Sequence, residues 1–340
     1  MRYLKLSFLL GLLTAALGAV DNVKLRVYEI APADQTPDLK NLKVWAEAAR
    51  AKPSAEVMPK PVFRLSDVEF LGTGRKEKLD LYLPNTSATT PRPGVLFIHG
   101  GGFTGGDKAE YRSTSVSADL ARAGYVVVSC NYVLSTKSNP AVWPQNIADC
   151  RQAIRWMREH AKELNLDEHR IAVAGGSAGG YLALMVGLAP EQPELGGDPK
   201  AKYSSQVSAV LDFYGVAESN KHGKATLAQA GPNAEQAFMP ATHAKAGAPP
   251  VLILHGDADT TLDISESHHL EAALRAAKIP HEFLIVKGGV HTFDLRPKGQ
   301  GWTSTAVRWE QGQEVVQTEH SNTPEITSKV LAFLEHTIGR

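Results

Sequence analysis

The residues best suited to chemistry centre on one serine. Ser177 lies in the segment Gly175–Gly179, which reads Gly-Gly-Ser-Ala-Gly, directly after the apolar run Ile171–Ala174. The residues that follow, Tyr181–Met185, are apolar at helical spacing. A serine in a sharp strand-to-helix turn is held in a strained backbone conformation that exposes its hydroxyl. We therefore predict that Ser177 is a nucleophile and that the N–H of Ala178 helps to bind an oxyanion.

A glycine-rich segment, His99–Phe103, directly follows the apolar run Val95–Ile98. Glycine lets the backbone approach a ligand closely and direct N–H groups at it. Such amides stabilise the negative charge that develops during acyl transfer, by roughly 3–4 kcal/mol for each donor. We predict an oxyanion hole formed by Gly101, Gly102 and Ala178. A phosphate-binding loop is disfavoured, because the segment lacks a Gly-Lys-Ser/Thr ending and no helix follows at once.

Two later strand ends supply the base and the orienting acid that a serine nucleophile requires. The apolar run Val251–Leu254 leads into an acidic segment that ends at Asp259. The run Phe283–Val286 is followed by His291. After a nucleophile in this kind of turn, the partners follow in the order Asp, His. We therefore predict Asp259 as the acid and His291 as the base.

Three other aspartates are alternatives for the acid. Asp257 lies two residues before Asp259 and is the main alternative. Asp263 falls at the start of a predicted helix, where capping is its expected role. Asp212 lies near the end of an earlier strand and is the weaker candidate.

The histidines outside this set are not expected to bind a metal. His99 and His255 begin their motifs and are predicted to be structural. His268 and His269 are adjacent on a predicted helix, so they do not share one face; with Asp263 they could suggest a metal, but exposed helix positions explain them better. The sequence therefore predicts no metal and no other cofactor.

The segments that must position these residues alternate between strands and helices. Apolar strands separated by amphipathic helices indicate a mostly parallel central sheet flanked by helices on both faces, with its chemistry at the carboxyl ends of the strands. An antiparallel pair of strands, joined through Gly72 and Gly74, is expected to come first. The predicted strands are 63–70, 78–83, 94–99, 125–131, 170–174, 207–213, 250–255 and 282–286, and the predicted helices are 113–123, 144–164, 178–188, 264–277 and 326–338.

Two stretches, 215–248 and 296–323, interrupt this alternation. The first is rich in small and polar residues, and the second carries three glycines, two tryptophans and several glutamines. Either could form a rim or cap over the site, or be a surface insertion without a role.

The N-terminus predicts export. Arg2 and Lys5 precede an almost continuous apolar run, Leu6–Leu17, and small residues end it at Ala19. This pattern is typical of a secretory signal peptide, and the run is shorter than the ~20 residues of a membrane span. We predict a signal peptide over residues 1–19, a secreted or periplasmic protein, and no stable membrane span after its removal. An uncleaved anchor is the alternative.

The rest of the chain divides into a short extension and one domain. Residues 20–61 hold several prolines and one helix-like stretch, 39–51, and are predicted to be a partly ordered N-terminal extension. Residues 62–340 are predicted to form the catalytic domain. The formal net charge is zero, so nothing indicates a nucleic-acid partner. Cys130 and Cys150 are predicted core residues, and an oxidising compartment would permit a bridge between them.

Four motifs together resemble a known group of enzymes. They are His99-Gly-Gly-Gly-Phe, Gly175-Gly-Ser-Ala-Gly-Gly, His255-Gly-Asp-Ala-Asp and Gly288-Gly-Val-His-Thr-Phe. The chain from about Val62 to its C-terminus resembles the hormone-sensitive-lipase-like and bacterial feruloyl or acetyl-xylan esterase branches of the α/β-hydrolases. It departs from that pattern in lacking a long helical cap before the first strand and in the length of 296–323.

The resemblance implies a cofactor-free carboxylic-ester hydrolase with a Ser177, His291 and Asp259 triad. Secreted members of these branches resemble enzymes that remove acetyl or feruloyl groups from plant polysaccharide, so the expected substrate is a small-molecule or polysaccharide ester. A formamidase or serine aminopeptidase on the same triad, a long-chain lipase and a non-catalytic binding relative are the alternatives. The sequence does not indicate the oligomeric state.

Overall fold

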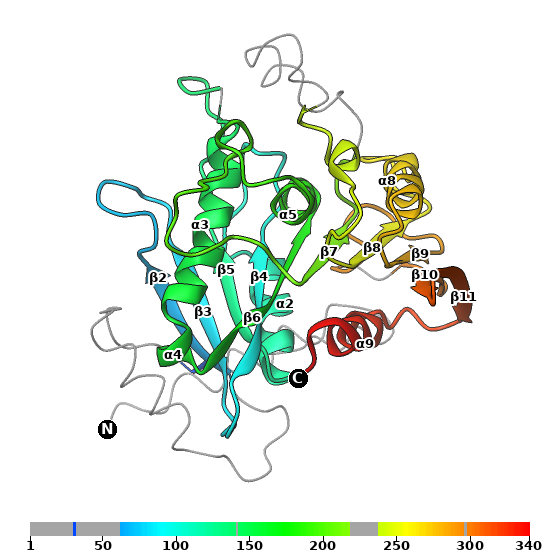
Figure 1. The fold of residues 1–340 in the computed structure, drawn as a ribbon, viewed down its shortest axis with the longest axis horizontal. Coiled ribbons are helices and arrows are strands. Elements are labelled where there is room, and N and C mark those ends of the chain that lie inside the picture. Colours follow the sequence, from blue (N-terminus) through cyan, green and yellow to red (C-terminus); the bar gives the residue numbers. More distant parts are fainter. Residues whose placement is uncertain (1–29, 32–61, 141, 218–236, 296–297) are drawn as a thin grey trace, which may run out of the picture.

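The computed structural model describes residues 30–31, 62–140, 142–217, 237–295 and 298–340 (Figure 1). The predicted signal peptide, the helix-like stretch 39–51 and most of 215–248 lie outside the described residues. Within the described ranges, no helix is long and apolar enough to cross a membrane.

The described strands form one sheet of eleven strands. Its centre, from β5 through β4, β6, β7 and β8 to β9, is parallel, and antiparallel strands flank it on both sides. The predicted antiparallel first pair, β2 with β3, is confirmed. In spatial order the strands are β1 (Ile30–Ala31), β2 (Val62–Val68), β3 (Leu79–Pro84), β5 (Val126–Cys130), β4 (Arg92–Ile98), β6 (Leu166–Gly176), β7 (Ala209–Phe213), β8 (Val251–Gly256), β9 (His281–Val286), β10 (Trp302–Glu310) and β11 (Gln313–Ser321).

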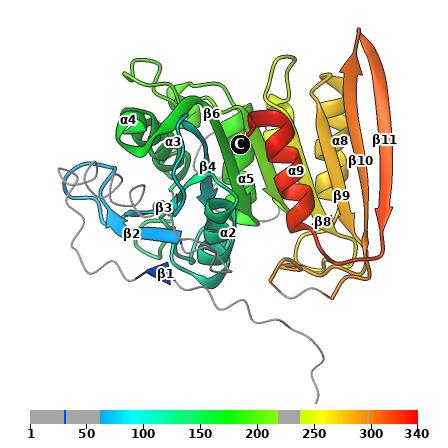
Figure 2. The ribbon, with the colours of Figure 1, turned by 90° about the horizontal axis from the view of Figure 1, so that it is seen from below.

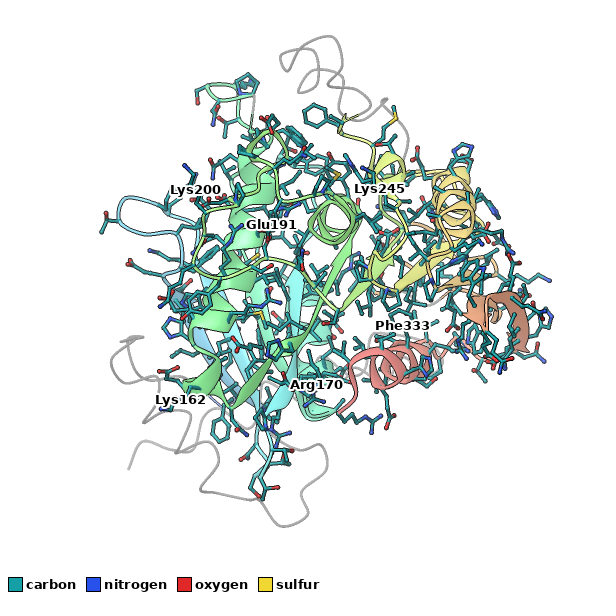
Figure 3. The ribbon with its side chains drawn as sticks, in the orientation of Figure 1. Lys162, Arg170, Glu191, Lys200, Lys245 and Phe333 are labelled. Carbon is teal, nitrogen blue, oxygen red and sulfur yellow. The ribbon has the colours of Figure 1, made fainter. Side chains whose placement is uncertain are left out.

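Helices cover both faces of the sheet, as predicted. Because side chains alternate along a strand, Val126 and Val128 of β5 enter the core beneath one set of helices, whereas Val127 enters the opposite core. Phe333 belongs to that second core (Figure 3). The first face is covered by α3 (Gln145–Glu159), α4 (Ala161–Leu164), α5 (Ala178–Leu188) and α8 (Ser265–Ala276), and the second by α2 (Tyr111–Arg122) and α9 (Thr327–Ile338).

The predicted helix 144–164 is wrong in one respect, because it is two helices. α3 ends before His160, and α4 is one turn that ends at Asn165 in the left-handed conformation. The buried face of α3 ends at Met157, and beyond it Ala161 and Leu164 of α4 pack against the same core. Asn165, in the left-handed conformation, ends α4, and β6 begins at the next residue.

The stretch 296–323 is a hairpin that widens the sheet. β10 pairs with β9 and β11 pairs with β10, both antiparallel (Figure 2). Gln311 and Gly312 form the turn, each with positive φ, which suits a tight two-residue hairpin. The segment therefore extends the edge of the sheet as an exposed hairpin, which fits the interpretation as a surface insertion better than that as a cap. Its alternating Thr, Val and Trp residues and its Gln-Gly turn were the overlooked signal.

Cys130 and Cys150 lie in the core, as predicted. Both are fully buried, Cys130 on β5 and Cys150 on α3, and both thiols are free.

Candidate active site

The nucleophile turn (Gly175–Gly179) joins β6 to α5. Ser177 has φ 57° and ψ −120°, a conformation that L-residues rarely adopt. Two backbone hydrogen bonds hold it there: its N–H donates to Phe213 O (2.9 Å), and its carbonyl accepts from Tyr181 N–H (3.0 Å). The strand, the helix and the neighbouring strand together impose the strained geometry that presents the hydroxyl.

Glycine is required on both sides of the serine. A Cβ added at Gly175 would lie 2.2 Å from Gly179 O, and one added at Gly179 would lie 2.1 Å from Ile98 O. No side chain fits at such distances, because the partner atoms belong to the backbone. The spacing of glycines read from the sequence therefore reflects direct contact between the turn and the end of β4.

The structure brings the three predicted triad residues into one hydrogen-bonded chain. His291 Nε2 lies 3.2 Å from Ser177 Oγ, and His291 Nδ1 lies 2.6 Å from Asp259 Oδ2. Because the carboxylate oxygen accepts, Nδ1 carries the proton, and Nε2 is left to accept from the serine hydroxyl. This is the arrangement in which a neutral imidazole can act as a general base.

Asp259 is held by more than His291. Its Oδ1 accepts hydrogen bonds from the N–H groups of Thr261 (2.8 Å) and Leu262 (3.0 Å), and its Oδ2 lies 3.3 Å from Nε2 of the buried His255. Burial alone raises the pKa of this carboxyl, but hydrogen bonds from His255 and His291 outweigh it and hold the pKa well below its usual range. Asp259 therefore stays ionised at every pH at which the imidazole of His291 can be neutral.

The alternative acids lie elsewhere. Asp257, Asp263 and Asp212 each accept a hydrogen bond from a nearby backbone N–H, at 2.6, 2.9 and 2.9 Å. Of the four aspartates, all within the described ranges, Asp259 is the one that contacts His291. His268, which was considered as a metal ligand, instead packs edge-on against Phe283.

The oxyanion loop (His99–Phe103) follows β4. Gly101 and Gly102 have φ of 112° and 60°, and a Cβ at Gly102 would meet nothing within 4 Å, so this loop borders open space. His99 is buried, with Nδ1 2.7 Å from Gly100 O. Ala178 begins α5, where N–H groups have no acceptor within their own helix. The three predicted donors thus come from two segments that meet at the ends of β4 and β6.

Aromatic side chains pack beside the oxyanion loop. The Phe103 ring meets Tyr181 edge to face, with centroids 5.4 Å apart. Trp143 Nε1 donates to the Tyr181 hydroxyl (2.9 Å), and the Trp143 ring contacts Phe238. Because Tyr181 lies one helical turn after Ser177, this aromatic cluster (Phe103, Trp143, Tyr181 and Phe238) is close to the nucleophile.

Sequence reasoning missed Asp294 of the histidine loop (Gly288–Leu295) and two side chains packed against it, Tyr214 and Arg112. The Tyr214 hydroxyl donates to Asp294 Oδ1 (2.6 Å), and Arg112 Nε lies 2.9 Å from Asp294 Oδ2. The Tyr214 ring lies edge to face with the His291 ring, with centroids 4.8 Å apart. Tyr214 and Asp294 are 80 residues apart, so no local pattern could have identified the group.

Comparisons with known proteins agree on the fold and the family. The profile of the BD-FAE family matches residues 79–274, more than half of the chain. That match includes the oxyanion loop, Ser177 and Asp259, but ends before His291.

The chain is 29% identical over 274 residues to LipM of Mycobacterium tuberculosis, described as a probable carboxylic ester hydrolase. The match covers 75% of this chain and 62% of LipM, which is less than two thirds of that relative. Esterase Est2 of Thermogutta terrifontis is 30% identical, with a TM-score of 0.55 over 64% of this chain and 79% of Est2. A truncated carbohydrate esterase from gut microbiota, 24% identical, shares the fold with a TM-score of 0.57 over 67% and 88% of the two chains.

These matches confirm the predicted fold class, a mostly parallel sheet of the α/β-hydrolase type. The chain belongs to the BD-FAE family, an esterase family with the α/β-hydrolase fold.

Proposed function

We propose that this protein hydrolyses carboxylic esters through an acyl-enzyme on Ser177. The observation that carries the proposal is the hydrogen-bonded chain from Ser177 Oγ through His291 to Asp259, next to the oxyanion loop. The names of the family's relatives, LipM and Est2 among them, support the same reaction class.

The geometry suits a two-step reaction. His291 Nε2 takes the proton of the Ser177 hydroxyl as Oγ forms a bond to the ester carbonyl carbon. The N–H groups of Gly101, Gly102 and Ala178 stabilise the oxyanion. The bond to the alcohol oxygen then breaks, and the imidazolium returns its proton to that oxygen. Water attacks the acyl-enzyme with the same base, which releases the acid and restores the serine. Asp259 keeps the proton on Nδ1 throughout.

Short-acyl esters and carbohydrate-linked acetyl or feruloyl esters are the proposed substrates. Phe103 and Trp143 each contact Tyr181, so aromatic side chains border the oxyanion loop. Est2 has been solved with propionate and with butyrate bound, and the gut relative is named a carbohydrate esterase. We therefore propose acetyl or feruloyl esters, small or attached to polysaccharide, as the substrate class.

Export is a second part of the proposal. Its support is the basic start and short apolar run of residues 1–19. Expression with the full leader should give a mature protein, outside the cytoplasm, whose N-terminal sequence begins near residue 20. An intact Met1 in the membrane fraction would identify an uncleaved anchor instead.

A panel of substrates tests the reaction and its range. We expect kcat/KM to fall as the acyl chain of p-nitrophenyl esters lengthens from acetate to decanoate, with release of acetate from acetylated xylan or of ferulate from methyl ferulate. Ser177→Ala should lose the activity while keeping the thermal unfolding temperature. Comparable turnover by Ser177→Ala would overturn the mechanism. Faster turnover of aryl formamides or aminoacyl anilides than of esters would reassign the substrate.

A further inference from the structure

We propose that the buried Arg112–Asp294 ion pair, with Tyr214, positions His291 for proton transfer with Ser177. The inference rests on the proposed hydrolase function, but it concerns groups outside the triad. Arg112, Tyr214 and Asp294 are positioning residues, since none of them touches the reacting atoms.

The ion pair connects three parts of the site. Asp294 lies three residues after His291 in the histidine loop, and Arg112 lies in the first turn of α2, which follows the oxyanion loop. Both side chains are buried, with 7% and 8% of their surfaces exposed. A Cβ at Gly176 would lie 3.3 Å from Arg112 Nη1 and from the Tyr214 hydroxyl, so the pair also reaches the nucleophile turn.

Tyr214 transmits this anchoring to the imidazole. Its hydroxyl is fixed by Asp294, and its ring lies against both His291 (4.8 Å) and Phe293 (5.4 Å). Arg112 packs over the same ring, with its guanidinium carbon 5.4 Å from the centroid. Tyr214 itself has φ 44°, and its N–H donates to Leu254 O (2.7 Å). A ring so constrained fixes one side of His291, while Asp259 fixes its Nδ1.

The charges of the pair should affect the pH dependence of the reaction. Arg112 and Asp294 balance each other near His291, so removing either one leaves a buried, uncompensated charge. A lone Asp294 carboxylate favours the imidazolium, and a lone Arg112 guanidinium disfavours it. Among the described residues, the ionisable or hydroxyl groups around His291 are Asp259 after β8, Ser177 before α5, Tyr214 after β7 and His255 behind Asp259. Glu110, before α2, faces Arg112.

The variants follow from this arrangement. Tyr214→Phe keeps the ring and removes only the hydroxyl bond to Asp294, so it is the mild probe of positioning. Arg112→Gln and Asp294→Asn, singly and combined, probe the charges. Tyr125→Phe is the matched control, because Tyr125 is an equally buried tyrosine whose charged neighbours are Arg340, Glu335 and Arg170 rather than Arg112 and Asp294. Each variant is first compared with the wild type by thermal unfolding.

We expect Asp294→Asn to lower kcat by up to ~100-fold with KM nearly unchanged, and Tyr214→Phe to lower it less. The acidic limb of the kcat/KM profile should move to higher pH in Arg112→Gln and to lower pH in Asp294→Asn, by about 1 unit each, and return in the double variant. Tyr125→Phe should match the wild type. Equal kcat in Tyr214→Phe and Tyr125→Phe, or limbs that move in the same direction, would overturn the inference.

One readout separates this inference from the proposed function. The titration of the His291 ring can be followed by NMR in the absence of substrate. Its midpoint should move to higher pH in Arg112→Gln and to lower pH in Asp294→Asn. A wild-type protein without esterase activity would contradict the proposed function, yet that titration would still support or overturn the positioning role.

Discussion

The nucleophile turn and the histidine loop meet at one hydrogen bond, but different forces hold them in place. The turn is fixed by backbone contacts, in which Gly175 and Gly179 approach carbonyl oxygens too closely for any side chain. The histidine loop begins with a similar backbone contact, in which Gly256 approaches Gly289 O, but its Asp294 end is fixed by the side chains of Tyr214 and Arg112 from distant segments. The difference teaches that backbone contact leaves a local sequence pattern, whereas long-range side-chain contact leaves none.

The largest effect should come from filling the backbone contact. Gly179→Ala places a methyl group about 2 Å from Ile98 O, so we expect a loss of stability of more than about 4 kcal/mol and no soluble active protein. Gly74→Ala is the control: Gly74 has positive φ, unlike Gly179, but open space around it, so the substitution should cost only about 1–2 kcal/mol. Equal unfolding temperatures for the two variants would show that the turn tolerates a side chain.

The next effect concerns the acid that orients His291. Asp259→Asn should lower kcat by about 10⁴-fold, because the amide no longer holds the proton on Nδ1. Asp257→Asn should leave kcat close to that of the wild type, because Asp257 accepts from a backbone N–H instead. Steady-state kinetics on one short ester would rank the two. The reverse ranking would move the acid to Asp257.

These two regions also explain how far the sequence could be interpreted. The turn, the oxyanion loop and the strand ends that carry Asp259 and His291 were all predictable, because each has glycine or strand signals within a few residues. Arg112 and Tyr214 were not, since their partners lie far along the chain. The hairpin β10–β11 was missed for a different reason. Its sequence does show the alternation of side chains typical of strands, but the predicted sheet already had enough strands to carry the triad, so no further strand was expected.

A smaller effect should appear at the end of β7, beside the nucleophile turn. Burial raises the pKa of Asp212 to about 7, so the folded protein holds this proton at pH values where the unfolded chain, with a pKa near ~3.9, has lost it. The resulting stabilisation is complete below about pH 4 and is lost as the pH rises through about 7, at ~1.4 kcal/mol for each unit of the shift.

Asp212→Asn removes this titration. The unfolding free energy of the wild type relative to the variant should therefore fall between pH 5 and pH 8, as measured by urea unfolding at each pH. A difference that stays constant over this range would show that Asp212 ionises normally.

The smallest effect should come from the edge of the sheet. Val316 of β11 is 50% exposed, and β11 is the edge strand, separated by β10 from β9, the strand that precedes His291. Val316→Thr should change the free energy of unfolding by less than about 0.5 kcal/mol and leave kcat/KM unaltered. A marked change in kcat/KM would show that the hairpin contributes to the active site.

The central claim is that Ser177 is the nucleophile, and active-site labelling tests it most directly. A fluorophosphonate probe added to the purified protein, followed by peptide mass spectrometry, should give one adduct on Ser177 that is absent in Ser177→Ala. Labelling of the wild type, whose triad is intact, should be faster than labelling of Asp259→Asn. A folded protein that gives no adduct, or an adduct on another residue with ester hydrolysis abolished, would contradict the account.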